Sequence, residues 1–184
     1  MSTIIIIAAV VVIIAWIIGL QRKLVSKEEL CNNAMSQIGV QQASRWDALS
    51  ALADLTRSYS EYEYKAITDI ISKRRPIGSG SSVSDANLQE KCIGEALGRI
   101  IAVGEQYPEL KASETYVKTM ESVNTYENQV RMSRMVFNDS VTALNRTVRQ
   151  FPNNLVAGLL GFKVKDYLAE GVGKESMPSM NLNK

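Results

Sequence analysis

Histidine is absent from this chain of 184 residues, and only two cysteines, Cys31 and Cys92, are present. Histidine is the commonest general base and the commonest metal ligand, so its absence removes most of the usual catalytic and metal sites. Two isolated cysteines do not form the paired spacing of a zinc site. We expect each cysteine to be a small buried side chain kept reduced in the cytosol, and we expect no cofactor and no metal.

An excess of charge of either sign is also missing. The formal net charge is +2, which gives no field that would attract nucleic acid, and we expect none as a partner. Carboxylates cluster as in Glu61 and Glu63, but side chains two positions apart on a helix point to different faces and cannot share a proton or a metal. We therefore expect no enzyme activity.

Charged residues are missing altogether between Ile4 and Leu20. This run of seventeen residues contains only Ile, Ala, Val, Trp, Gly and Leu, which predicts a helix spanning a bilayer core of roughly 30 Å. A cleaved signal peptide is the competing interpretation, but no basic residue precedes the run and no small-x-small site follows it. We expect residues 1–23 to be a membrane anchor, represented by Ile4, Ile7, Val11, Ile14, Trp16 and Leu20.

The basic residues beside this run predict its orientation. Arg22, Lys23 and Lys27 follow the run, whereas Met1 to Thr3 contains no basic residue. Cytoplasmic flanks carry the excess of lysine and arginine. The protein is therefore expected in the inner (cytoplasmic) membrane as a single-pass protein, with its N-terminus outside and the rest of the chain in the cytoplasm.

The stretch from Tyr116 to Phe151 has the heptad pattern of a long helix that packs lengthwise against others. The polar exceptions on this seam are Glu127 and Arg134. A helix of this length needs partner helices to bury its apolar stripe. Nine of the eleven seam positions are apolar: Tyr116, Met120, Val123, Val130, Phe137, Val141, Leu144, Val148 and Phe151.

A second heptad pattern predicts one helix from Leu24 to about Arg75, continuous with the membrane span. Gln42, Arg45 and Thr56 place polar groups on its seam. These residues either lie where the helices are open to water or specify the register of packing at some cost in stability. Arg45 is a candidate partner for Glu127, although a simple return of the following helix would place Glu127 nearer Asp69.

Pro76 ends this helix, and Ile77 to Ser84 is a Gly/Ser linker. It is not a phosphate-binding loop, because the Gly-Lys-Ser/Thr sequence and the preceding strand are both missing. We expect Ser84 to be the N-cap of the next helix, and the apolar periodicity predicts that this helix extends to about Gln106.

A stop at Phe151-Pro152 precedes a short, unusually apolar helix predicted from Leu155 to Ala169. Residues 171–184 have no periodicity and are expected to form a disordered tail. Because the predicted helices differ greatly in length, long ones should overhang short ones and leave apolar seam positions uncovered. We expect the final helix to contact another copy of the chain or anionic headgroups through Leu155, Leu159, Leu160, Phe162, Lys163 and Lys165.

Several stretches together resemble the LemA family of bacterial membrane-anchored helical proteins. They are Lys23–Val25, Met35–Gln41, Arg45–Leu55, Tyr107–Ala112, Tyr126–Val130, Phe137–Val141, Asn145 and Phe151–Phe162. The chain departs from the family pattern at Trp46, where a second basic residue is usual, and at Ala48–Leu52, where the usual Leu-Ile-Pro-Asn-Leu-Val would supply a Pro and an Asn. It also departs at Gly39, where an acidic residue is usual.

The resemblance implies an all-α fold, in which residues 24–170 form an up-and-down four-helix bundle with long coiled-coil-like helices on a single membrane span. It implies no established enzyme activity. A relative acts in forming magnetosome membranes, which suggests by analogy a scaffold that self-associates and shapes the membrane. The alternative is an adaptor that binds another membrane protein. The expected partners are thus the lipid bilayer, further copies of the chain and, in the adaptor alternative, a second membrane protein.

Overall fold

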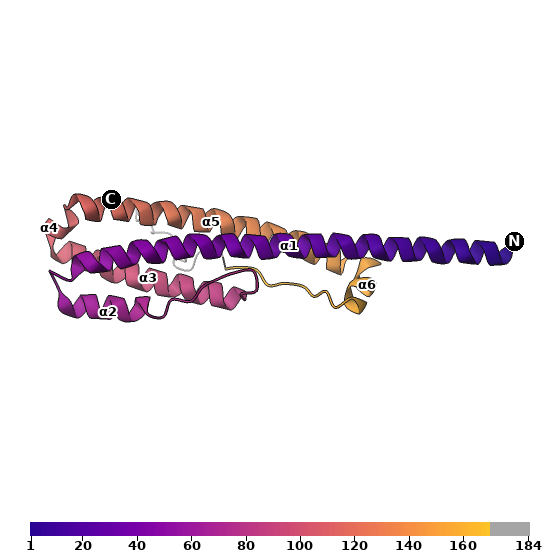
Figure 1. The fold of residues 1–184 in the computed structure, drawn as a ribbon, viewed down its shortest axis with the longest axis horizontal. Helices are drawn as coiled ribbons and strands as arrows, with labels where there is room; N and C mark the ends of the chain where they lie inside the picture. The colour runs from indigo at the N-terminus through magenta and orange to yellow at the C-terminus, as the bar shows by residue number, and fades with distance from the viewer. Residues whose placement is uncertain (170–184) are drawn as a thin grey trace, which may run out of the picture.

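Residues 1–169 of the computed structural model are described, and they form six helices and no strand (Figure 1). The predicted all-α class is confirmed for this part of the chain. The predicted tail at 171–184 lies outside the described residues. The helices are α1 (Ser2–Thr56), α2 (Glu61–Ile71), α3 (Val83–Gln106), α4 (Pro108–Lys111), α5 (Glu114–Arg149) and α6 (Asn153–Leu159).

Helix α1 runs unbroken for 55 residues, from the apolar run into the packed part of the protein. Most side chains before Leu20 are exposed, whereas Leu20 and Leu24 are buried. The predicted continuity between the apolar span and the following helix is confirmed. We call residues 20–169, in which side chains pack together, the helical body.

The expectation of one helix up to Arg75 is wrong. Helix α1 ends at Thr56, and α2 begins after Ser60, whose hydroxyl accepts a hydrogen bond from the Glu63 amide at 3.3 Å. An N-cap serine satisfies one of the free amides at a helix start. Helix α2 lies against α1, and Arg74 just beyond its end pairs with Asp47 of α1 at 2.6 Å.

Helix α3 begins earlier than predicted, because Ser82 rather than Ser84 is its cap. The Asp85 amide donates to the Ser82 hydroxyl at 3.1 Å, and the Ser82 amide donates to the Asp85 carboxylate at 3.2 Å. This reciprocal arrangement is a capping box. Hydrogen bonds from Ser82 lower the pKa of Asp85. The predicted end at Gln106 is confirmed.

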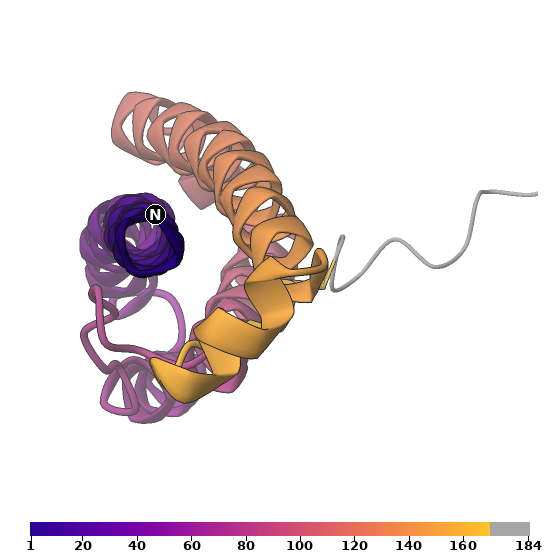
Figure 2. The ribbon, with the colours of Figure 1, turned by 90° about the vertical axis from the view of Figure 1, so that its right-hand side faces the viewer.

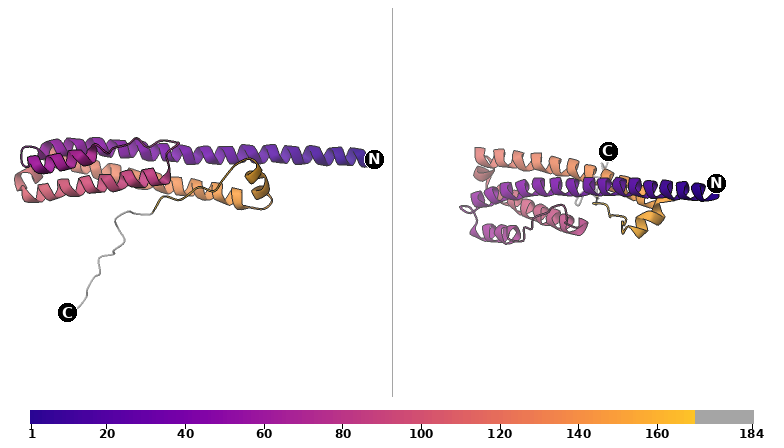
Figure 3. Two further views of the ribbon diagram at one scale, coloured as in Figure 1. Left: turned by 90° about the horizontal axis from the view of Figure 1, so that it is seen from below. Right: turned by 45° about the vertical axis from the view of Figure 1, so that its right-hand side comes forward.

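Helix α5 contains the predicted seam and lies beside α1 through the body (Figure 3). Seven of its apolar seam positions are buried, Met120 is half-buried and Phe151 lies exposed beyond the helix end. The expectation of an uncovered apolar seam is therefore wrong for α5 up to Val148, because α1 is long enough to cover it, whereas Phe151 stays uncovered.

Helix α6 is shorter than expected, ending at Leu159 rather than Ala169. Gly161 adopts a φ of +81°, which favours glycine, and the Phe162 amide donates back to the Ala157 carbonyl at 3.0 Å. This geometry terminates a helix. The chain then returns along α5 without helical structure.

Two asparagines of α5 hold this returning segment. Asn145 accepts from the Lys165 amide and donates to the Lys165 carbonyl, both at 2.8 Å. Asn138 makes the same pair of bonds to Leu168, at 3.0 and 3.1 Å. The two side chains are seven residues apart and lie on one face of α5, so they fix the segment in register.

Apolar side chains form two core clusters. The first core cluster, near the apolar span, includes Leu20, Leu24, Cys31, Ala34, Met35, Ile38, Phe137, Val141, Leu144, Val148, Ala157 and Leu168. The second core cluster, at the far end of the body, includes Trp46, Leu49, Leu52, Ile67, Ile70, Ile93, Ala96, Ile100, Leu110, Tyr116 and Val123.

The loop between α2 and α3 crosses α1 at Gly39. A Cβ atom at Gly39 would lie 1.9 Å from the Ile77 carbonyl oxygen. Because backbone cannot move aside as a flexible side chain can, we expect Gly39→Ala to destabilise the body by about 1–3 kcal/mol, the usual cost of overpacking. Urea unfolding in detergent, followed by the fluorescence of buried Trp46, measures this loss.

Gly94→Ala is the matched control for this prediction. Gly94 lies within α3, and a Cβ atom added there would have no neighbouring atom within 4 Å. Alanine at this position should therefore gain up to about 1 kcal/mol from helix propensity. Equal effects of the two substitutions would show that the crossing loop does not constrain α1.

Candidate functional site

A layer of polar side chains separates the two core clusters. Gln42 and Arg45 of α1 lie between the α1 residues of the first core cluster and those of the second. Glu127 and Arg134 occupy the corresponding interval on α5. Glu90 of α3 completes this group. We call these five residues the polar layer.

Arg45 is at the centre of the polar layer. Its Nη1 lies 2.6 Å from Glu90 Oε1, and its Nη2 lies 3.9 Å from Glu127 Oε2. Gln42 donates to Glu90 Oε2 and to the Ala86 carbonyl, both at 3.2 Å. The suggested proximity of Arg45 and Glu127 is thus observed, but sequence reasoning missed the closer partner, Glu90.

The polar residues on the α1 seam are buried rather than open to water. Gln42, Arg45 and Thr56 are each at most 2% exposed. Among the described residues, Gln42 Oε1, Arg45 Nε and Trp46 Nε1 have no hydrogen-bond partner. Burying polar groups in this way costs free energy, so we expect the layer to contribute to a specific register more than to net stability.

Arg134 anchors the end of the described chain. It donates to Asn87 Oδ1 at 3.0 Å and to the Ala169 carbonyl at 2.6 Å. Burial lowers the pKa of Arg134, and nearby Glu90 partly opposes this shift. An arginine titrates far above neutral pH, so the side chain stays cationic and ties α5 to α3 and to the returning segment.

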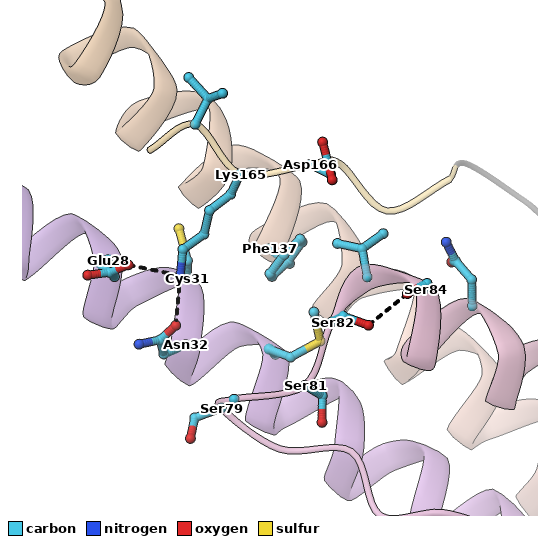
Figure 4. A pocket seen from close by; sticks show the side chains of 15 residues that line it. Glu28, Cys31, Asn32, Ser79, Ser81, Ser82, Ser84, Phe137, Lys165 and Asp166 are labelled. Carbon is cyan, nitrogen blue, oxygen red and sulfur yellow. Dashed lines mark hydrogen bonds and ion pairs between the residues drawn. The ribbon is translucent and has the colours of Figure 1, made fainter. Parts of the chain in front are cut away.

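A pocket of about 630 Å³ opens beside the first core cluster (Figure 4). Lys165 reaches across it to Glu28 Oε1 at 3.3 Å and donates to Asn32 Oδ1 at 3.0 Å. Burial raises the pKa of the Cys31 thiol, which therefore stays protonated and poorly nucleophilic. The pocket is lined by residues of α1, by Phe137, by residues 79–84 and Asn87, and by residues 164–166.

The two cysteines are free thiols. Cys31 is buried in the first core cluster, and Cys92 is half-buried against the second. Within residues 1–169, no three Cys, Asp or Glu side chains are grouped so that they could hold a metal ion. The pocket offers an ion pair, two asparagine amides and serine hydroxyls to a ligand.

The predicted anchor residues fall into two environments. Helix α1 is the one helix in the described chain that is long and apolar enough to cross a membrane. Leu20 is only 6% exposed and belongs to the first core cluster, so the exposed apolar run meets the helical body at this residue. The exposed anchor residues are Ile4, Ile7, Val11, Ile14 and Trp16.

The predicted contact residues between Leu155 and Lys165 also differ in their exposure. Leu155, Leu159, Leu160 and Lys163 are exposed, as the contact prediction requires. Phe162 is half-buried against the first core cluster, and Lys165 is held in the pocket. Figure 2 shows α6 lying across the end of the body that faces the N-terminus.

The model of the LemA family matches residues 34–181, which is most of the chain. The chain belongs to the LemA family. The match begins after the apolar span and includes the polar layer, most of the pocket and α6. The resemblance noted in the sequence is therefore confirmed.

Individual LemA-family relatives are similar over shorter stretches. Magnetosome protein MamQ 2 of Paramagnetospirillum magneticum is 33% identical over 94 residues, covering 51% of this chain and 34% of that protein. Magnetosome protein MamQ of Magnetospirillum gryphiswaldense is 35% identical over 77 residues, covering 42% and 28%. Protein LemA of Metamycoplasma hominis is 24% identical over 142 residues, covering 76% and 64%. The chain thus spans about a third of the length of the MamQ proteins.

Proposed function

We propose that this LemA-family protein is a non-catalytic scaffold, anchored in the cytoplasmic membrane by α1, whose copies associate and organise or shape the membrane. The observation that carries this proposal is that a single helix forms both the apolar span and the central element of the body. An α-helix is stiff over this length, so the body keeps a defined direction relative to the membrane. A scaffold that imposes geometry needs this rigidity.

In this proposal α1, α2, α3 and α5 act as an up-and-down four-helix bundle whose spine is the coiled-coil-like pair α1 and α5. The buried heptad positions of α5 support such a spine. Ion pairs between helices support the remaining packing, including Arg99 of α3 with Glu63 of α2 at 3.3 Å.

Family names support a structural role only by association. The MamQ relatives are named magnetosome proteins, and neither that name nor the LemA name denotes a reaction. Exposed apolar side chains on the outside of the body give copies of the chain surfaces through which to associate. They include Val40 on α1 and Met132, Met135 and Val136 on α5.

The proposed topology places the body in the cytoplasm and the N-terminus outside. We expect Gly80→Cys, in an exposed loop of a variant lacking Cys31 and Cys92, to resist an impermeant thiol reagent in intact cells. Ser2→Cys should react under the same conditions, because it precedes the apolar run. The reverse labelling pattern would contradict the assignment from the basic flank.

The scaffold proposal is tested by the mass of the full chain in detergent and by electron microscopy after reconstitution with lipid alone. We expect regular assemblies of the wild type. Val40→Glu with Met135→Glu should lose assembly while keeping the fold, since both side chains are exposed. Leu88→Glu with Ile101→Glu, which changes exposed residues of α3, is the control and should assemble. A wild type that is monomeric in both media would rule out the scaffold.

An adaptor for another membrane protein is the second candidate, and the pocket beside Cys31 favours it. Its serine hydroxyls, Asn87 and the Lys165–Glu28 pair offer hydrogen bonds and charge to a polar segment of a partner. An adaptor needs no contact between copies. A protein that stays monomeric in lipid but co-purifies with one stoichiometric membrane protein would support it.

A further inference from the structure

Helix α6 lies at the level where the apolar span enters the body. Leu20 is the first buried residue of α1, and Leu20, Leu24 and Ala157 of α6 belong to the same core cluster. Val156 packs against that cluster as well. Because α1 would leave the bilayer near Leu20, α6 is placed at the membrane surface rather than deeper in the cytoplasm.

The outer side of this end of the body is apolar. Phe151 is 76% exposed, Leu155 is 61% exposed and Leu159 is 88% exposed, and Leu160 is also exposed. Only Ala157 of α6 is buried. We call the segment from Phe151 to Leu160 the end cap.

Positive charge surrounds the end cap. The sequence has no Asp or Glu in residues 1–27 or 140–165, so all 19 acidic residues lie elsewhere. Arg22 and Lys23 of α1, Arg146 and Arg149 of α5, and Lys163 are exposed at this end. Basic side chains beside an apolar surface suit anionic lipid headgroups, whereas they would repel the same positive end of a second copy.

We propose that the end cap inserts into the headgroup region of an anionic bilayer and gives the protein a second membrane contact beside the span. This inference rests on the proposed anchoring by α1. Helix α6 crosses the direction of α1 (Figure 2), so it lies in the plane of the membrane when α1 stands across it. The exposed leucines then enter the boundary between headgroups and acyl chains, and the arginines contact lipid phosphates.

The test uses the full chain with Cys31→Ala and Cys92→Ala, reconstituted in vesicles. One fluorophore is attached at Leu159→Cys. The control carries it at Met132→Cys, because Met132 is likewise exposed, at 60%. Met132 lies about 25 Å back along α5 from Arg149. A spin-labelled phospholipid serves as quencher in vesicles of phosphatidylcholine with or without one third phosphatidylglycerol.

We expect lipid quenching at Leu159 to exceed that at Met132 at least about twofold when phosphatidylglycerol is present. Arg146→Glu with Arg149→Glu should remove much of this quenching, whereas Lys111→Glu with Arg131→Glu, exposed elsewhere on the body, should not. Equal quenching with and without phosphatidylglycerol would overturn the role of anionic lipid.

Flotation of the vesicles distinguishes a failure of the proposed anchoring by α1 from a failure of the proposed end-cap contact. Protein that does not float with lipid contradicts the anchor itself. Protein that floats, but shows no excess quenching at Leu159, overturns the end-cap contact alone. A third outcome would assign the end cap to a second copy. In that case the fluorophore at Leu159 is shielded from an aqueous quencher, is not quenched by the spin-labelled lipid, and the protein has twice the mass of one chain.

Discussion

Val123→Asp is expected to unfold the far half of the helical body. Val123 is fully buried in the second core cluster, on the seam of α5. Burying an unpaired carboxylate among apolar side chains costs at least several kcal/mol, which is comparable with the whole stability of an average domain. Near-UV circular dichroism and Trp46 fluorescence of the full chain in detergent report this loss, because Trp46 belongs to the same cluster.

Val136→Asp is the matched control, because it places the same charge on an exposed position of the same helix. It should change stability by about 0.5 kcal/mol or less. Val130 is a less decisive site, since Arg134 is one helical turn away and an aspartate there has a basic partner. If Val123→Asp unfolds at the same urea concentration as Val136→Asp, the α5 seam is not the core.

The long helices were predictable because their signal is periodic. The seam from Tyr116 to Phe151 gives α5 to within two residues at each end, and its apolar members up to Val148 are buried except for the half-buried Met120. The break after Thr56 was missed because Tyr59 continues the heptad pattern without Pro or Gly. Ser60 and Glu63 carry the spacing of a capping box, which was the available signal.

The structure of the segment that follows α6 could not be predicted from local sequence. Residues 160–169 are not helical because Gly161 terminates α6 and because Asn138 and Asn145 bond the backbone of the returning segment. Those bonds join residues 20 to 30 positions apart. Pairings at such separations depend on the tertiary fold, so periodicity does not contain them.

Two departures from the family pattern acquire physical reasons in the structure. Gly39 leaves room for the Ile77 carbonyl, which an acidic side chain would displace. Trp46 stands where a basic residue is usual, and it fills the second core cluster together with Ile67 and Ile70 of α2. These residues therefore tie α1 to α2 and to the crossing loop, which is a structural role.

Polar residues on the seams suggested that Arg45 lies near Glu127, but they did not predict its closer partner, Glu90. Arg45 and Glu127 were visible as charges at heptad positions. Glu90 lies on α3, and only the packing of α3 against α1 brings it within 2.6 Å of Arg45. The partner of a buried charge is set by three helices together, whereas a heptad pattern describes one.

Arg45→Met is expected to destabilise the body by about 3–5 kcal/mol, the usual result of removing one member of a buried ion pair. The loss is large because Glu90 is only 17% exposed and would keep its charge beside Gln42 after losing the cation that pairs with it directly. A double-mutant cycle with Glu90→Gln should give a coupling of about 1–3 kcal/mol. The cycle with Glu127→Gln should give less than about 1 kcal/mol, because Glu127 is 41% exposed and 3.9 Å away.

The double variant Arg45→Met with Glu90→Leu tests whether the polar layer acts on the stability of the body or on the register of α1 against α5. Replacing a buried ion pair by apolar side chains is often neutral or stabilising, so its urea midpoint should recover to near that of the wild type. If the polar layer specifies register, distances between spin labels on exposed sites of α1 and α5 should broaden in this variant and stay sharp in the wild type. A sharp, unchanged distance would assign the polar layer no role in selecting the register of α1 against α5.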